Sequence, residues 1–206
     1  MLSFINVEQQ CGEMYFRQID LSRVVLCREN LPQIDFSQTI LTQANLQSIN
    51  LTQALLIEAD LTEACLEKAI LFQASMQLSN LSQAVLSQAD LREVNLSEAL
   101  LYQASLRKSQ LHKANLSQSI LQRAFMREAN LNYAILSEAN LQQANLMNAE
   151  LIGADLSRAN LEGAFLVEAN LKGANLEGAN LNRAILTGAI MPDGSIINRE
   201  WGMGNR

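Results

Sequence analysis

The chain has 206 residues, 49% of them hydrophobic, and a formal net charge of −6 at pH 7. The acidic balance disfavours nucleic acid as a direct partner, because 15 Lys and Arg residues make a phosphate-binding surface only where they cluster. No apolar run reaches the roughly 18 residues of a spanning helix, so we also expect no membrane contact.

The first 13 residues differ from the rest of the chain and contain apolar Leu2, Phe4, Ile5 and Val7. They have neither the basic start nor the apolar length of a signal peptide. Cys11, Cys27 and Cys65 are odd in number and irregularly spaced, which suits reduced thiols. We therefore predict a cytoplasmic protein whose residues 1–13 form an N-terminal cap.

From residue 14 to residue 191 the sequence repeats every five residues without a break. Each unit has a small residue, then often Asn or Asp, then a central Leu, then two polar residues. Leu fills 31 of the 36 central positions between Phe16 and Met191. The small position holds Ala in 25 units, with bulkier residues such as Ile34 and Ile49 near the start.

A period of five residues fits neither an α-helix nor a long strand. At about 100° per residue, successive Leu side chains would rotate around a helix and form no apolar face. In a strand, residues five apart point to opposite faces. Ala139 and Leu141, two residues apart within one unit, would share a face. We therefore expect short extended sides joined by bends, with Leu and Ala inside a coil.

The units ADLTE, ADLRE, ANLNY, ANLQQ, ADLSR, ANLEG and ANLKG resemble those of the pentapeptide-repeat proteins, including cyanobacterial members. This resemblance covers about residues 15–191. It implies an all-β solenoid, a right-handed quadrilateral β-helix with four units and 20 residues per coil. About nine coils would then stack to roughly 43 Å at strand spacing.

Three features depart from the regular repeat. Glu29 occupies an inward small position, so its carboxylate must be paired or turned outward. Towards the C-terminus the second polar position becomes Gly, as at Gly153 and Gly173, which suggests type II turns at those corners. Residues 192–206 begin with Pro-Asp-Gly, and we expect them to fold over the last coil as a C-terminal cap through Ile196 and Trp201.

The sequence offers no converging catalytic groups. His112 is the single histidine and falls at an outward position, and no set of residues has metal-ligand spacing. The carboxylates are spread over a convex rod, and no glycine-rich phosphate loop is present. We expect no enzymatic activity, no cofactor and no metal.

Function should then depend on the surface. With 20 residues per coil, residues spaced by 20 share a face, and one face collects apolar residues, which favours a contact surface. Its members on or beside the column are Val25, Cys65, Val85, Phe125, Met147, Phe165, Val167 and Ile185. The alternative is that these residues tuck under a corner.

A candidate basic patch on adjoining faces comprises Arg107, Lys108, Lys113, Arg123 and Arg127. Its alternative explanation is a solvated, salt-bridged belt.

Two functions follow as hypotheses. The first is a rigid scaffold or regulator that binds another protein and is itself a monomer or a weak dimer. The second is a DNA mimic that binds DNA gyrase or topoisomerase, as the resemblance to quinolone-resistance members of the family implies. The distribution of surface charge should separate them, since mimicry requires a continuous acidic face.

Overall fold

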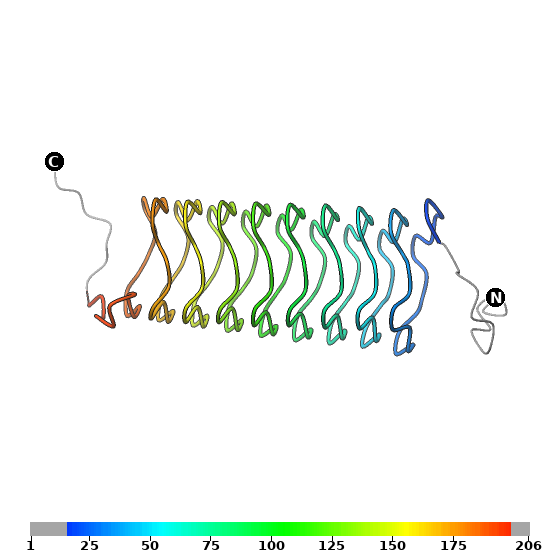
Figure 1. The fold of residues 1–206 in the computed structure, drawn as a ribbon, viewed down its shortest axis with the longest axis horizontal. Coiled ribbons are helices and arrows are strands. Elements are labelled where there is room, and N and C mark those ends of the chain that lie inside the picture. Colours follow the sequence, from blue (N-terminus) through cyan, green and yellow to red (C-terminus); the bar gives the residue numbers. More distant parts are fainter. Residues whose placement is uncertain (1–15, 199–206) are drawn as a thin grey trace.

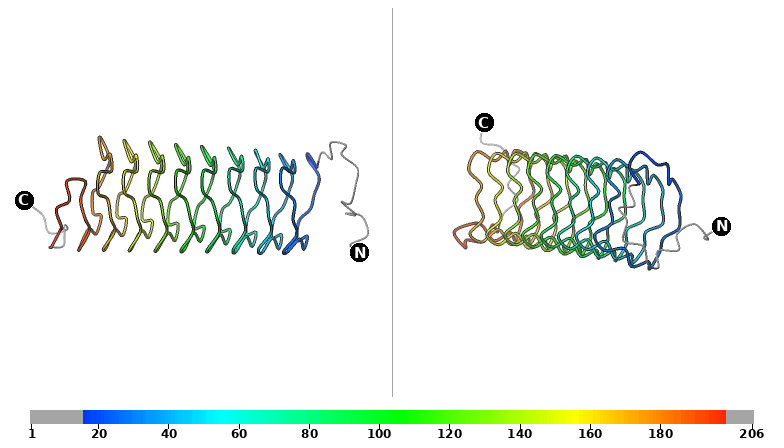
Figure 2. Two further views of the ribbon diagram at one scale, coloured as in Figure 1. Left: turned by 60° about the horizontal axis from the view of Figure 1, so that its bottom comes forward. Right: turned by 45° about the vertical axis from the view of Figure 1, so that its right-hand side comes forward.

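The computed structural model describes residues 16–198, which form one straight rod of stacked coils (Figure 1). Successive coils repeat along a single axis with little change in shape (Figure 2). Residues 16–198 contain no helix and no strand longer than a single bridging residue. The predicted N-terminal cap, residues 1–13, and Trp201 lie outside the described residues.

Parallel bridges join each residue before the central position to the residue 20 positions later, from Asp20–Ile40 to Asn170–Ile190. Four five-residue units therefore make one coil, as the family resemblance implied. Adjacent coils share regular backbone hydrogen bonds. For example, the Leu46 N–H donates to the Cys65 carbonyl at 2.8 Å, and the Cys65 N–H donates to the Ala44 carbonyl at 2.9 Å. Residues spaced by 20 thus form four ladders along the rod.

The corners between sides are tight turns closed by a local hydrogen bond. The N–H of the small residue donates to the carbonyl of the preceding central residue, as Ala44 does to Leu41 at 3.0 Å. The second corner residue has positive φ along the whole rod, from Gln18 to Gly188. A type II turn has negative φ at its first corner residue and positive φ at its second, and these corners follow that pattern. The sequence suggested this geometry only where glycine occurs, but Gln, Glu, Lys and Arg corners adopt it too.

The Asn or Asp before each central residue has a defined role. Its side-chain oxygen accepts a hydrogen bond from the N–H of the first corner residue two positions on, as from Thr62 N to Asp60 Oδ1 at 3.0 Å. The same Asx turn occurs from Asp20 to Asn180. It satisfies a corner N–H that has no backbone partner, which explains why the repeat prefers Asn and Asp there.

The core consists of the central and small side chains, as predicted. Leu41 through Leu171 are buried at almost every central position, and bulky Ile49 is fully buried without disturbing the register. The buried serines at the small position bond locally, since the Ser79 hydroxyl donates to the Met76 carbonyl at 2.7 Å and Ser109 and Ser119 do the same to the preceding central residue. Glu29 is exposed while its N–H still donates to the Leu26 carbonyl, so no carboxylate is buried there.

Beyond the last repeat the chain turns at residues 192–194 and pairs back on the rod. Ile196 bridges Ile190 in antiparallel fashion, and the Ile197 N–H donates to the Ala189 carbonyl at 3.0 Å. Ile197 packs against the core, whereas Ile196 is 57% exposed. The expectation that Ile196 plugs the coil was wrong by one residue, because antiparallel pairing does not keep the five-residue count.

Candidate functional site: an apolar ladder between two polar corners

The ladder that begins at Val25 carries the predicted apolar face, and we call it the contact ladder. Its members are Val25, Asn45, Cys65, Val85, Ser105, Phe125, Asn145, Phe165 and Ile185, each bridged to the next. Phe125 is 47% exposed and Phe165 40% exposed. These rings therefore present a substantial part of their surface to solvent instead of tucking under a corner.

Bridging places Phe125, Asn145 and Phe165 on three successive coils. The two rings are thus about 10 Å apart along the rod at strand spacing, with one asparagine between them. Met147 and Val167 belong to the corner that follows the ladder and are partly buried. Apolar side chains therefore continue from the ladder onto this corner.

The basic residues divide between different corners. Arg107, Lys108 and Arg127 lie on the corner after the contact ladder, two of them paired with Glu128. Its carboxylate is 3.4 Å from Lys108 Nζ and 3.1 Å from Arg127 Nε. Lys113 follows Leu111 and lies one corner further around the coil. The five basic residues therefore occupy three successive corners around the coil, with Arg123 on one side of the central group and Lys113 on the other.

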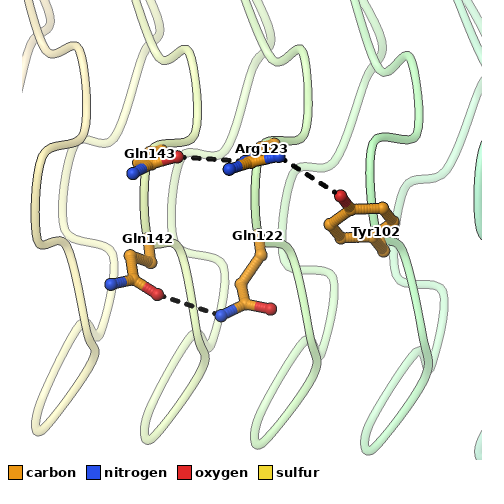
Figure 3. A pocket seen from close by; sticks show the side chains of 5 residues that line it. All are labelled: Tyr102, Gln122, Arg123, Gln142 and Gln143. Atoms are coloured by element: carbon orange, nitrogen blue, oxygen red, sulfur yellow. Dashed lines mark hydrogen bonds between the residues drawn. The ribbon is translucent and has the colours of Figure 1, made fainter.

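Arg123 lies on the corner before the contact ladder, beside a shallow polar depression of about 240 Å³ (Figure 3). Its Nε donates to Gln143 Oε1 at 3.0 Å and its Nη1 to the Tyr102 hydroxyl at 3.4 Å. Below it, Gln122 Nε2 donates to Gln142 Oε1 at 3.0 Å. These side chains bond mainly to one another, and the sequence had singled out only Arg123 among them.

The remaining reactive side chains stay apart. His112 meets the ring of Tyr133 edge-on at 5.6 Å, and Cys27 and Cys65 are free thiols. Within residues 16–198, no three His, Cys, Asp or Glu side chains are grouped so that they could hold a metal ion. The same stretch contains no helix that could cross a membrane.

Charge is mixed around the contact ladder, which itself has no ionisable side chain except the thiol of Cys65. The two corners that border it carry cations in excess. The cations are Arg23, Arg28, Lys68, Arg107, Lys108, Arg123, Arg127 and Arg183, and the anions are Glu63, Glu67, Glu128, Glu162 and Glu168. This side of the rod is therefore basic although the whole chain is acidic.

Comparisons with known proteins agree with this architecture. The family model described as pentapeptide repeats matches residues 19–56, 41–73, 79–118, 109–148 and 149–188. The chain is similar to the crystal structure of HetL, a pentapeptide repeat protein involved in heterocyst differentiation regulation from the cyanobacterium Nostoc sp. strain PCC 7120. The identity is 37% over 90% of this chain and 94% of HetL, with a TM-score of 0.53.

Two further solved structures are similar in part. Rfr23, from the cyanobacterium Cyanothece 51142, is 43% identical over 45% of this chain and 56% of its own, with a TM-score of 0.21. Trypsin-treated QnrB1, a plasmid-mediated fluoroquinolone resistance protein, is 16% identical over 78% and 88%, with a TM-score of 0.40. Comparison with curated proteins gave no match. The repeat, the 20-residue coil and the likeness to HetL together show that the chain belongs to the pentapeptide-repeat family, whose fold is the right-handed quadrilateral β-helix.

Proposed function

We propose that this protein is a non-enzymatic scaffold or regulator that docks another protein on the contact ladder. The observation that carries the proposal is the half-exposed pair Phe125 and Phe165 on one straight ladder. Aromatic side chains dominate the binding energy of most protein interfaces, particularly when polar groups surround them. The likeness to HetL, which is involved in regulating differentiation, supports the regulatory class.

In this proposal the rod has about nine coils, with residues 1–13 and 192–206 covering its ends, and acts in the cytoplasm as a monomer or weak dimer. A coil held to its neighbours by backbone hydrogen bonds on all four sides is rigid. A rigid surface loses little conformational entropy when it binds, which favours docking without rearrangement.

The alternative, a DNA mimic that binds gyrase, has less support. Mimicry needs a continuous acidic surface to replace phosphates, and the corners beside the contact ladder carry more cations than anions. We therefore favour an acidic protein partner over a basic DNA-binding enzyme.

The experiment is affinity capture from the native cell with wild-type protein and two double variants. Phe125→Ser with Phe165→Ser should abolish capture of a partner while melting stays almost unchanged. Asn140→Ser with Asn160→Ser, on a neighbouring ladder, should leave capture intact. If the phenylalanine variant melts much earlier than wild type, or still captures the same partner, the contact-ladder proposal is wrong.

A further inference from the structure

Most first-corner N–H groups beside the contact ladder lack a hydrogen-bond acceptor. Within the described residues, Asn45 and Asn145 cap the N–H groups of Gln47 and Met147, both at 3.2 Å. The other ladder members are apolar, Cys or Ser and form no Asx turn. The unpartnered N–H groups belong to Cys27, Glu67, Ser87, Arg107, Arg127, Val167 and Thr187.

The other three ladders differ, because Asn and Asp predominate on them. The ladder of Asp20, for example, caps six of its nine corners, whereas the contact ladder caps two of nine. Unsatisfied donors therefore concentrate on the side of the rod that also exposes the aromatic rings. A row of free N–H groups, one coil or about 4.8 Å apart, attracts anionic oxygen atoms.

Arg107 is exposed, as are Cys27 and Arg127 among these corners. The Arg107 N–H is free, its guanidinium has no ion pair among the described residues, and the ladder residue before it is the small Ser105. One coil along, the Arg127 N–H is also free beside Phe125, although the Arg127 guanidinium is paired with Glu128. Arg107, Lys108 and Arg127 together face only the carboxylate of Glu128, so positive charge remains uncompensated.

The capped corner at Met147 shows where an oxygen atom of a bound partner would lie. At Met147, on the same corner two coils from Arg107, the oxygen of Asn145 accepts the equivalent N–H at 3.2 Å. A carboxylate oxygen in the corresponding place at Arg107 would accept the N–H and lie beside the guanidinium. Such charge-assisted hydrogen bonds are about twice as strong as neutral ones.

We propose that this corner binds the carboxylates of an acidic amphipathic helix from a partner protein, lying along the rod with its apolar stripe on Phe125 and Phe165. This inference rests on the proposed docking function and specifies the partner's chemistry. Carboxylates at helix positions i and i+3 are about 4.5 Å apart along the axis, close to one coil. Positions i and i+7, about 10.5 Å apart, match the two coils between the rings.

An extended segment fits the same rows poorly. Its same-face side chains recur about every 6.7 Å, which matches neither one coil nor two. The described coils also pair with their neighbours along the rod, so this side offers no open sheet edge to which a strand could add. Spacing therefore favours the helix.

Ser105 allows a test with a matched control. Ser105→Asn should install the Asx cap seen at Asn145 and block the Arg107 N–H while keeping every cation and both rings. Ser105→Ala removes the same hydroxyl, which bonds to Ser87 Oγ at 2.9 Å, but leaves the N–H free. The probe is a labelled, blocked Ala-based helical peptide with Glu at i and i+3 and two Leu seven residues apart on the adjacent stripe, titrated by fluorescence anisotropy.

We expect Ser105→Asn to weaken peptide binding about tenfold, the lower end for one hydrogen bond to a charged group, and Ser105→Ala to leave it within twofold. The Gln-for-Glu peptide should bind at least tenfold more weakly. In ¹⁵N-labelled full-length protein, the amide signals of Arg107 and Arg127 should shift on peptide addition and that of Met147 should not.

Equal binding by the two Ser105 variants, or by the Glu and Gln peptides, would overturn the carboxylate role. Undiminished binding of a peptide with a central proline would overturn the helix. Partner capture that needs Phe125 and Phe165 but ignores Ser105→Asn would refute this inference and leave the docking function standing. If Phe125→Ser with Phe165→Ser weakens neither peptide binding nor partner capture, both this inference and the docking function are wrong.

Discussion

The corner column that begins at Gln33 has different chemistry at its two ends. In the first coils, side-chain amides link one coil to the next: Gln33 donates to Gln53 at 3.0 Å, Gln53 to Gln73 at 2.9 Å and Gln73 to Glu93 at 2.8 Å. In the last coils the same column holds Gly153 and Gly173. All these residues have φ between 56° and 68°.

The backbone conformation is thus constant while the residue type changes. A left-handed conformation costs a non-glycine residue about 1–2 kcal/mol, and glycine almost nothing. In the amide-linked region, hydrogen bonds between coils offset that cost at about 0.5–1.5 kcal/mol each. The glycine corners have neither the free-energy cost of positive φ nor the side-chain hydrogen bonds between coils. The stack, and not the corner residue, therefore sets the corner geometry.

Both regions depend on the same core, so a core substitution should have the largest effect. Leu136→Asp places a charge among fully buried side chains and should prevent folding. Ser137→Asp, one residue on, should change stability by no more than about 0.5 kcal/mol. Circular dichroism melting of both proteins tests this. Similar destabilisation by the two variants would mean that the inward register is wrong.

A side chain added to the glycine region should restore the cost of the left-handed conformation. Gly153→Ala should lower the free energy of unfolding by about 1–2 kcal/mol. The new Cβ would lie 2.7 Å from Tyr133 Cε1, so this ring must also move. Gly173→Ala has no atom within 4 Å and should cost less. Denaturant titration distinguishes them, and a larger loss at Gly173 would contradict the steric explanation.

Leu78 shows the cost without the compensation. Its φ is 59° and its side chain is 49% exposed. In the same corner column, Gln38 donates a hydrogen bond to Glu58, but the apolar Leu78 cannot extend this chain of hydrogen bonds to the next coil. Leu78→Gly should therefore stabilise the rod by about 0.5–1 kcal/mol, after the extra unfolded-state entropy of glycine. Gln53→Gly, which loses two hydrogen bonds, should be neutral or destabilising. Urea melts that rank these variants in the opposite order would refute the compensation.

The first and last coils should also differ in acid sensitivity, because four of the five ladder aspartates lie in the first half of the rod, namely Asp20, Asp35, Asp60 and Asp90. A hydrogen bond from the Arg92 side chain lowers the pKa of Asp90 below its ordinary value of 3.8 and outweighs partial burial. A lowered folded-state pKa contributes stability above pH 3.8 that is lost as pH falls through the folded value.

Asp90→Asn should therefore be slightly less stable than wild type at pH 6, and this difference should shrink at pH 2.5. Melting temperatures at the two pH values measure it, with Arg92→Gln as the partner variant in a double-mutant cycle. Strictly additive losses from the two substitutions would show that the ion pair is not the source.

The sequence predicted the parts of this fold that depend on the period. Leu spacing identified the buried positions, and counting by 20 aligned Phe125 with Phe165, because no insertion disturbs the count. It did not predict left-handed backbone at Gln and Lys corners, since local preference opposes it and pairing between coils imposes it. It also missed the Asx turns, although the alternation of Asn with apolar residues held that signal.

Neighbours on the basic surface are set by the twenty-residue coil, and not by proximity in sequence. Lys108 and Lys113 are five residues apart but on different corners, whereas Arg107 and Arg127, twenty apart, are neighbours. Ile197 replaced Ile196 at the rod end for a related reason, because the tail leaves the parallel register.

The four-unit coil makes the interior and the exterior respond differently to changes in chain length. Removing one five-residue unit between Phe125 and Phe165 would return a Leu to every central position, so the interior would be preserved. The surface beyond the deletion, however, would rotate by one side, and Phe165 would align with Ile120 and Asn140 instead of Phe125. Removing twenty residues would shorten the rod by one coil and leave every side aligned. Evolution can therefore alter the length of such a molecule in whole coils while keeping its surface pattern, and can rearrange that pattern in single units while keeping its core.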